Sequence, residues 1–206
     1  SIKGNQTYQP CDVEIEGDFS QAAFWLVAGT IGEPIELTGL NPNSAQGDRV
    51  ILDILKEMGA TPKWQGTSLL ATPAPTRGII IDVAQCPDIV PILAVLAARS
   101  EGITKIINAE RLRIKESDRL AAMRSELTKL GVMIEETGST LTITGTRNLN
   151  SASVDSHDDH RIAMSMGVAS ILLDQPLTLT HAEVISKSYP EFWEDFTRLG
   201  GKINEC

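Results

Sequence analysis

The feature that most constrains the fold of this 206-residue chain is an internal repeat with a period of about 70 residues. Three glycines that each end a segment of helical periodicity lie 72 and 69 residues apart: Gly59, Gly131 and Gly200. Three aspartates that each precede an apolar segment lie 70 and 71 residues apart: Asp18, Asp88 and Asp159. An internal period is stronger evidence about a fold than any single motif. The sequence therefore predicts three similar structural units in tandem.

Each unit is predicted to contain a strand, an apolar helix, a second strand, an amphipathic helix and further extended structure. In the first unit these segments are 13–18, 22–31, 34–40, 48–58 and a hairpin over 61–72. In the second they are 79–83, 89–98, 102–108, 117–130 and a hairpin over 132–144. The third unit is shorter, with segments 152–155, 162–173, 177–180, 190–199 and 202–204.

The three apolar helices indicate how the units assemble. A helix that is apolar on all sides must be surrounded by protein, and about ten residues are too few to cross a bilayer. Three such helices from equivalent units are therefore expected to pack together at the centre, with strands and amphipathic helices outside. The predicted fold class is α/β (α+β), and residues 1–206 are expected to form one domain with pseudo-threefold symmetry.

The charge balance and the cysteine pattern exclude several classes of protein. With 18 basic and 27 acidic residues the net charge is −9, so no general affinity for nucleic acid or an anionic membrane is expected. The three cysteines are far apart and odd in number, which argues against a disulfide framework and a zinc site. No signal peptide or membrane-spanning run is visible, so a cytoplasmic location is expected. The missing initial Met leaves open a targeting segment that has been removed.

One stretch, residues 111–120, places four cations and two carboxylates between a predicted strand and a predicted helix. Ser117 is predicted to be the N-cap of that helix. Arg119 then lies in the first turn, where a cation opposes the helix macrodipole unless an anion binds beside it. The alternative is an ordinary solvated charge run at the start of a helix.

The other predicted helix starts are polar too, and Arg161 again places a cation in a first turn. Because equivalent helices should begin at related ends of the domain, their polar residues are expected to converge. The converging set is Asp88, Lys115, Glu116, Arg119, His160, Arg161 and Lys187. Two cations at equivalent helix starts favour a bound anion, and the carboxylates beside them favour acid–base chemistry on it. The alternatives are helix caps for Asp88 and Asp159 and an exposed lysine for Lys187.

No other motif assigns chemistry to the chain. There is no GxGxxG and no GxxxxGK[ST], so a nucleotide cradle is not supported. No Ser/His/Asp or Cys/His arrangement stands out either. Neither a metal nor a cofactor is therefore predicted.

Five stretches together resemble the C-terminal part of the 5-enolpyruvylshikimate-3-phosphate synthase family, whose members are inhibited by glyphosate. They are VEIEGDFSQAA (13–23), CPD (86–88), IKESDRL (114–120), DDHRIAM (158–164) and SKSYP (186–190). They occur in the family's order and run from near the start of the chain to near its end. The chain has about half of the family's usual length, and the N-terminal part is the one without a counterpart.

The resemblance implies an enzyme of two similar enolpyruvyl transferase domains, each built from three βαβαββ units around buried parallel helices. This chain would be the C-terminal domain, and the N-terminal domain would be its partner. The implied activity transfers the enolpyruvyl group of phosphoenolpyruvate to the 5-hydroxyl of shikimate 3-phosphate, through a tetrahedral intermediate, with release of phosphate. This is a step of aromatic amino acid biosynthesis, and the resemblance implies no cofactor.

The resemblance also implies roles for the converging residues. Asp88 would be the base near the 5-hydroxyl, and Glu116 the acid that protonates the methylene carbon of phosphoenolpyruvate. Lys115 would lie between the substrates, binding shikimate 3-phosphate and sharing in the proton transfer. The carboxylate and phosphate of phosphoenolpyruvate would be held by Arg119, Arg161 and Lys187, with His160 nearby. Because a coupled Lys–Glu–Asp cluster shares its protons, the assignment of acid and base stays open.

Two departures from the family pattern limit what this chain is expected to do alone. Many members carry Asn four residues before the motif lysine, where this chain has Arg111, so the resemblance does not settle whether Arg111 contacts shikimate 3-phosphate. Other contacts to shikimate 3-phosphate belong to the N-terminal domain, as does an N-terminal Lys–Ser pair that folds back onto this one. The chain alone is therefore expected to be folded but catalytically inactive.

Two alternatives compete with this interpretation. The sister enzyme that transfers enolpyruvate to UDP-N-acetylglucosamine typically has Asp-Leu-Arg-Ala-Gly where this chain has DHRIA at 159–163. The second alternative is a non-catalytic scaffold of three units whose charges are ordinary caps. Alanine replacement of Arg119 and Arg161 should separate them, because a scaffold would keep its melting temperature and its anion binding.

Overall fold

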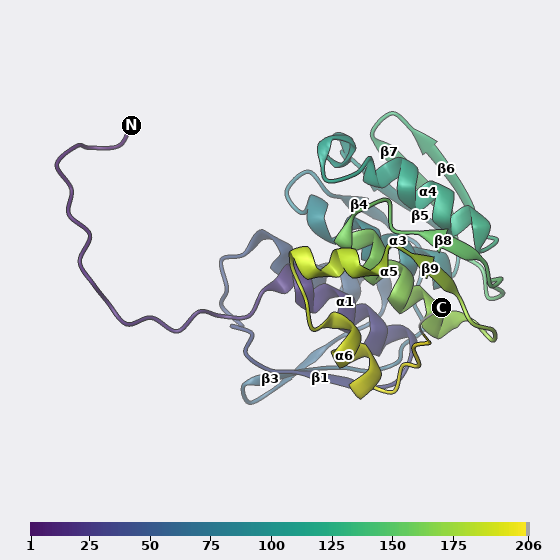
Figure 1. Cartoon of the computed structure of the whole chain (residues 1–206), viewed down its shortest axis with the longest axis horizontal. Coiled ribbons are helices and arrows are strands. Elements are labelled where there is room, and N and C mark those ends of the chain that lie inside the picture. The colour runs from purple at the N-terminus through teal and green to yellow at the C-terminus, as the bar shows by residue number, and fades with distance from the viewer. Residues whose placement is uncertain (205–206) are drawn as a thin grey trace.

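Three apolar helices pack against one another at the centre of the fold, which the computed structural model describes for residues 1–204 (Figure 1). They are α1 (Phe19–Ile31), α3 (Val90–Arg99) and α5 (His160–Ala169). Every residue of α5 is buried, as is every residue of α3 except Arg99. Helices with no polar face need such an environment. The predicted buried centre is confirmed.

The second unit contains all of its predicted elements, in the order strand, helix, strand, helix, strand, strand. They are β4 (Ile80–Asp82), α3, β5 (Ile103–Ile107), α4 (Arg119–Lys129), β6 (Met133–Thr137) and β7 (Thr140–Thr144). The sheet order is β4-β5-β7-β6, in which β4 and β5 are parallel and the hairpin is antiparallel. Ile106 lies between Ile81 and Leu141 across this sheet, and all three are buried beside α3.

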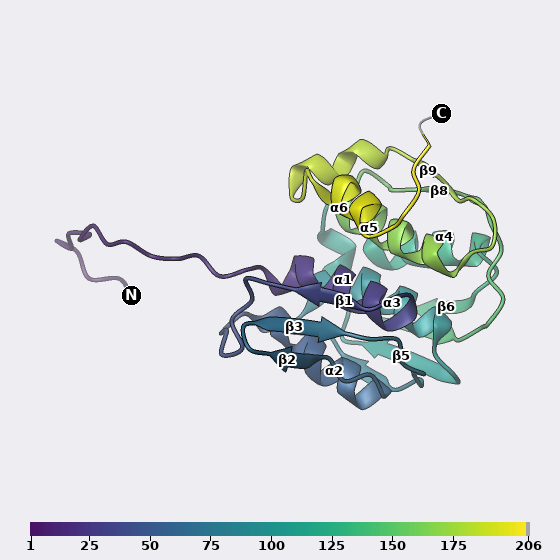
Figure 2. The ribbon, with the colours of Figure 1, turned by 90° about the horizontal axis from the view of Figure 1, so that it is seen from below.

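The first unit forms a smaller sheet of order β1-β3-β2. After α1 its elements are β1 (Ile35–Leu37), the 3-10 helix η1 (Gly47–Val50), α2 (Ile51–Met58), β2 (Lys63–Gln65) and β3 (Ser68–Ala71). Viewed from below, α1 and α3 lie between this sheet on one side and α5 and α6 on the other (Figure 2). The amphipathic character predicted for residues 48–58 is confirmed, because Ile51, Ile54, Leu55 and Met58 are buried.

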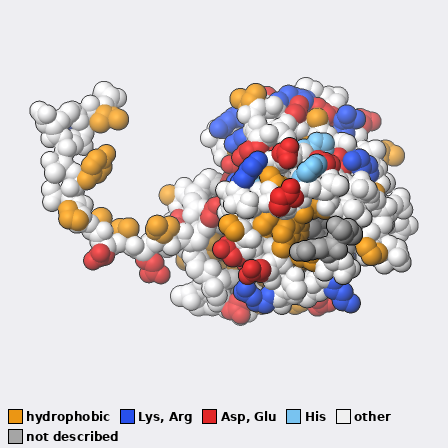
Figure 3. All heavy atoms as spheres, viewed as in Figure 1, with side chains coloured by type: hydrophobic (Ala, Val, Ile, Leu, Met, Phe, Trp, Pro, Cys, Tyr) orange, Lys and Arg blue, Asp and Glu red, His pale blue; other side chains and the backbone are white. Residues whose placement is uncertain are grey.

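The strand predicted over residues 13–18 does not form. Residues 1–17 are an extended arm that leaves the body of the fold and carries exposed hydrophobic side chains, among them Val13 and Ile15 (Figures 1 and 3). A strand needs a paired neighbour, and the backbone link between this arm and the first unit is one hydrogen bond from Gly17 N to Gly39 O at 2.7 Å. Asp18 caps α1 as expected, accepting from Ser20 N.

The third unit is the least complete. After α5 it contains η4 (Ser170–Leu172), η5 (Ala182–Lys187) and α6 (Phe192–Arg198), and its strands β8 (Ser153–Asp155) and β9 (Thr178–Thr180) form a parallel pair. The strand predicted over 202–204 is wrong, since these residues pair with no strand in the described structure. The last helix was expected at Pro190 but begins at Phe192, after a turn in which Phe192 N donates to Tyr189 O.

The glycines that marked the repeat do end helices. Gly59, Gly131 and Gly200 have φ angles of 111°, 88° and 101°, a left-handed conformation that side chains disfavour. The units therefore share their helix-ending glycines and the succession of an apolar helix, a strand and a second helix, while pseudo-threefold symmetry remains a prediction. No helix within residues 1–204 has the length and apolar character needed to span a membrane.

Candidate functional site

The residues that precede α3, α4 and α5 meet at one end of the central helices. The short 3-10 helices η2 (Pro87–Ile89) and η3 (Glu110–Ile114), which lead into α3 and toward α4, are in contact. Arg119, the first residue of α4, bonds both to Asp88 of η2 and to Asp159 at the start of α5. The predicted convergence of these helix starts is therefore observed.

Asp88 is the carboxylate on which three cations converge. Its Oδ1 lies 2.7 Å from Arg119 Nη1, 3.1 Å from Lys115 Nζ and 3.8 Å from Arg161 Nε. Burial alone would raise the pKa of Asp88, but the charge of Arg161 and the hydrogen bonds of Lys115 and Arg119 outweigh it and lower that pKa. Asp88 is not a helix cap, because Cys86 and Ile89 occupy the cap positions of η2 and α3.

Arg119 is only 1% exposed, and its guanidinium is surrounded by carboxylates of the chain itself. Nε and Nη2 donate to Asp159 at 2.7 and 3.3 Å, Nη1 donates to Asp88, and Nη2 also donates to Glu116 Oε2 at 2.7 Å. Burial alone would lower the pKa of Arg119, but Asp159 and Glu116 raise it, so the guanidinium stays protonated. The anions that balance this cation at the start of α4 are therefore protein side chains.

The helix caps differ in one place from the prediction. Ser117 is not the N-cap of α4; Asp118 is, and its Oδ1 accepts from Ala121 N at 3.1 Å. Ser117 Oγ instead donates to Asp159 Oδ2 at 3.1 Å. Asp159 is the N-cap of α5, as considered above, and accepts from Arg161 N at 2.9 Å. Asp159 thus caps α5 and also binds the side chain of Arg119, the first residue of α4.

His160 is buried at the first position of α5, with 5% of its surface exposed. Its Nδ1 is buried and has no hydrogen-bond partner within the described residues. Burial, together with the positive charge of Arg161, lowers the pKa of His160. Its imidazole is therefore neutral near pH 7, with one nitrogen left for another group.

Lys187 and Arg111 lie at the margins of the cluster. Lys187 ends η5, is exposed, and donates from Nζ to the carbonyl oxygen of Asp158 at 2.9 Å. Arg111 donates from Nη1 to the carbonyl oxygen of Ala84 at 3.3 Å. Arg161 lies further in and donates from Nη1 to the Asp88 carbonyl at 3.3 Å. All predicted site residues thus lie around the same helix starts, with Arg111 and Lys187 outermost.

A pocket of about 350 Å³ opens beside this cluster. Its lining includes three predicted residues, Asp88, Lys115 and Arg111, and six that were not predicted: Ser20, Gln46, Gly47, Asp48, Gln85 and Pro87. Burial raises the pKa of Asp48, although its hydrogen bond from Ser20 opposes this. One sequence signal was available, because Asp48 stands at the start of the amphipathic helix of the first unit, as Asp118 does in the second.

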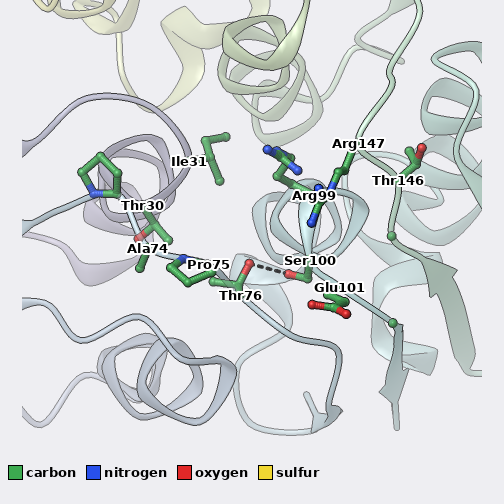
Figure 4. Close-up of a pocket in the computed structure, with 13 residues that line it drawn as sticks. Thr30, Ile31, Ala74, Pro75, Thr76, Arg99, Ser100, Glu101, Thr146 and Arg147 are labelled. Carbon is green, nitrogen blue, oxygen red and sulfur yellow. Dashed lines mark hydrogen bonds between the residues drawn. The ribbon is translucent and has the colours of Figure 1, made fainter.

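A larger pocket of about 620 Å³ lies at the other ends of the central helices. Its lining includes Thr30 near the end of α1 and Arg99 and Ser100 at the end of α3, together with Arg147 (Figure 4). The Thr76 and Ser100 hydroxyls bond to each other there at 2.8 Å. None of the predicted site residues lines it, so size alone does not identify the functional site.

The charges around the smaller pocket are balanced and closely coupled. Three cations contact three carboxylates directly: Lys115, Arg119 and Arg161 with Asp88, Glu116 and Asp159. Such a cluster can hold an anionic ligand and move a proton between neighbouring groups. Within residues 1–204, no group of His, Cys, Asp and Glu side chains is arranged to hold a metal ion.

Comparison with known proteins assigns this chain to a family. A family model described as EPSP synthase (3-phosphoshikimate 1-carboxyvinyltransferase) matches residues 1–196. The chain is 53% identical to the 3-phosphoshikimate 1-carboxyvinyltransferase of Clostridium kluyveri over 204 residues, which is 99% of this chain and 48% of that relative. It is 52% identical to the protein of the same name from Clostridium acetobutylicum, over 99% of this chain and 47% of the relative.

Solved structures agree with this match. EPSP synthase from Acinetobacter baumannii superposes with a TM-score of 0.81 at 29% identity, over 92% of this chain and 47% of that one. The enolpyruvyl transferase NikO from Streptomyces tendae superposes with a TM-score of 0.71 at 23% identity, over 94% and 45%, which shows a shared fold. The chain spans about half the length of the curated relatives it matches. Because the family model covers nearly all of it, the chain belongs to the EPSP synthase (3-phosphoshikimate 1-carboxyvinyltransferase) family.

Proposed function

We propose that this chain supplies the C-terminal half of an active site that transfers the enolpyruvyl group of phosphoenolpyruvate to the 5-hydroxyl of shikimate 3-phosphate. The observation that carries the proposal is the convergence of Asp88, Lys115, Glu116, Arg119 and Arg161 at the helix starts of a chain of this family. Three of these residues are cations suited to two anionic substrates, and two are carboxylates suited to proton transfer.

The proposed chemistry assigns each group one task. Asp88, with Lys115 at 3.1 Å, takes the proton of the 5-hydroxyl, and that oxygen bonds to the central carbon of phosphoenolpyruvate. Glu116 gives a proton to the methylene carbon, which becomes a methyl group in the tetrahedral intermediate. Loss of phosphate and of one methyl proton then restores the double bond in the product. Arg119, Arg161, Lys187 and neutral His160 hold the carboxylate and phosphate oxygens.

The lowered pKa of Asp88 bears on this assignment. At neutral pH the carboxylate is ionised and can accept a proton, but it is a weak base while three cations surround it. Withdrawal of one of these cations toward a substrate anion strengthens it. Substrate binding and base strength are therefore linked in the proposed mechanism.

The proposal also includes a second protein half. The chain covers 48% of the Clostridium kluyveri relative, and we assign the remaining half to an N-terminal domain that supplies the rest of the shikimate 3-phosphate site. This chain by itself is proposed to be folded and inactive. Its described cysteines, Cys11 and Cys86, are free thiols, which fits the proposed cytoplasmic location.

Reconstitution tests this function. The chain is co-expressed with the N-terminal half of the Clostridium kluyveri relative, and phosphate release from phosphoenolpyruvate and shikimate 3-phosphate is measured. The matched control is the same relative expressed as its own two halves. We expect release from the pair and none above background from either half alone.

Two results would contradict the proposal. Turnover by this chain alone, at the rate of the intact relative, would contradict the half-site. Turnover of the pair only with UDP-N-acetylglucosamine as acceptor would favour the sister enzyme. The scaffold alternative predicts a stable pair without turnover, but it does not explain why Asp88 binds three cations rather than capping a helix.

A further inference from the structure

The guanidinium of Arg119 has two edges that can each bind a carboxylate through two hydrogen bonds. The edge formed by Nε and Nη2 is occupied by both oxygens of Asp159, which is 0% exposed. The edge formed by Nη1 and Nη2 is occupied by two different side chains, with Asp88 Oδ1 and Glu116 Oε2 each at 2.7 Å. Asp88 and Glu116 thus each supply one oxygen to an edge that a single carboxylate can bind with both of its oxygens.

The two occupants of this second edge are held with very different strength. Asp88 also contacts Lys115 and Arg161, so it is anchored whether or not it binds Arg119. Arg119 is the only hydrogen-bond or ion-pair partner of Glu116 within residues 1–204, and the Glu116 side chain is 40% exposed. Glu116 also lies outside η3 and before the first residue of α4, so no helical backbone hydrogen bond fixes its position. Glu116 is therefore the occupant that can leave.

We infer that Glu116 is a displaceable occupant of the ligand-facing edge of Arg119, which an incoming carboxylate or phosphate replaces. Its removal uncovers Nη2 and leaves the rest of the guanidinium fixed by Asp159. The buried ion pair with Asp159 fixes the orientation of the Arg119 guanidinium. Glu116 competes with an incoming anion and so lowers the affinity of Arg119 for it. The inference rests on the proposed function only in naming phosphoenolpyruvate as the natural ligand.

This arrangement makes Glu116 a specificity-determining residue. A ligand that places a carboxylate or phosphate oxygen at Nη2 replaces the contact of Glu116, whereas a ligand without an anionic oxygen there leaves the ion pair between Glu116 and Arg119 intact. Displacement also frees the Glu116 carboxyl group at the moment the anion arrives. The same side chain therefore opposes ligand binding and becomes available for proton transfer once the ligand is bound.

The test is the affinity of the 206-residue chain for phosphoenolpyruvate and for inorganic phosphate, measured by isothermal titration calorimetry. The variants are Glu116→Gln and Glu116→Ala, and the control is Glu110→Gln. Glu110 is exposed, lies six positions earlier, and has no hydrogen bond or ion pair within residues 1–204, so its variant removes the same charge from a neighbouring site. We expect both Glu116 variants to bind the anions about two- to fivefold more tightly than Glu110→Gln. In the reconstituted pair, Glu116→Gln should lower kcat.

Opposite effects on affinity and turnover are the signature of this role, which a merely structural residue would not show. Unchanged or weaker binding by both Glu116 variants would overturn the inference. Absence of binding in every variant would overturn it too, because the uncovered edge of Arg119 must gain an anion. The reconstitution assay reports separately on the proposed function, since activity of the pair can persist when this inference fails.

Discussion

Arg119 at the start of α4 and Asp159 at the start of α5 form a two-point ion pair that is closed off from solvent. The contact joins residues 40 positions apart in the sequence and fixes the two helix starts relative to each other. A buried pair adds little net stability compared with apolar residues, but loss of one partner leaves an uncompensated charge. The pair therefore fixes the geometry of the site.

Loss of this contact should be costly. Replacing Asp159 with alanine removes the N-cap of α5 and both contacts to Arg119, and we expect it to lower the free energy of unfolding by about 3–5 kcal/mol. Urea denaturation followed by circular dichroism measures the change. The matched control is Asp158→Asn, whose exposed side chain makes no hydrogen bond or ion pair within residues 1–204 and which should change stability by less than about 0.5 kcal/mol. Equal effects of the two variants would show that the pair does not fix the fold.

Glu126 should be a second anchor of the same region. It lies two turns after Arg119 on α4, is 0% exposed, and accepts from His157 Nε2 at 2.8 Å, Lys129 Nζ at 2.7 Å and Asp155 N at 2.9 Å. It thereby holds the turn that leads from β8 into α5. Glu126→Leu should cost roughly 2–4 kcal/mol, because it leaves the Asp155 N–H without its partner and removes the contacts to His157 and Lys129.

The conservative variant gives the control for Glu126. Glu126→Gln keeps an oxygen for Asp155 N and a polar amide group beside His157 Nε2, so it should cost clearly less than the leucine variant. Chemical denaturation of both variants measures the difference. If the two variants were equally unstable, the negative charge rather than the hydrogen-bonding geometry would be the stabilising factor.

Stability should fall in two stages as the pH is lowered. His160 has a lowered pKa in the folded state, so the unfolded chain takes up a proton first once the pH falls below about 6.5. The folded-state pKa values of Asp88, Asp159 and Glu126 are lowered as well. Their contribution is present above about pH 4 and is lost as the pH falls further, because the unfolded state then binds more protons. Thermal denaturation from pH 8 to pH 3 measures both stages. His160→Gln should remove the first and keep the second; persistence of the first stage would assign it to another group.

Arg161 is the better of the two arginines for testing ligand binding. Because Arg119 is enclosed by three carboxylates, its replacement by alanine should destabilise the fold, so the comparison of both alanine variants considered from the sequence would mix two effects. Arg161 makes longer contacts, 3.3 Å to the Asp88 carbonyl and 3.8 Å to its carboxylate. Arg161→Gln should keep the melting temperature within a few degrees and lower kcat/KM of the reconstituted pair at least tenfold. A folded variant with unchanged kcat/KM would show that Arg161 does not contribute to the active site.

The sequence predicted the fold well where local pattern decides it. The apolar helices, the helix-ending glycines and the hairpins depend on residues close together in the chain, and they were found as expected. The strands over 13–18 and 202–204 failed because a strand exists only when another strand pairs with it. The cap of α4 was wrong by one residue, since Ser117 and the neighbouring Asp118 are both good caps.

The position of the candidate site could be predicted from the sequence, but the hydrogen bonds and ion pairs within it could not. Helix starts in a repeat must converge, and this was enough to bring Asp88, Lys115 and Arg161 together. Two of the three carboxylates that bind Arg119, Asp88 and Asp159, lie 31 and 40 positions away, and no periodicity specifies such contacts. Consequently Arg119, which was expected to bind an external anion, is already paired with carboxylates of the chain itself. Ser20 was missed for the same reason, because only the packed structure places it in the pocket, whereas Asp48 could have been found from its position at the start of a predicted helix.

The charge cluster at the helix starts, and not the larger pocket, is proposed to bind the anion. Titration of the 206-residue chain with phosphoenolpyruvate, followed by ¹⁵N NMR of the arginine Nε–H groups, tests it most directly. We predict saturable shifts of the Arg119 and Arg161 signals, while those of Arg99 and Arg147 in the larger pocket stay in place. Shifts of Arg99 and Arg147 with no change at Arg119 and Arg161 would contradict the account.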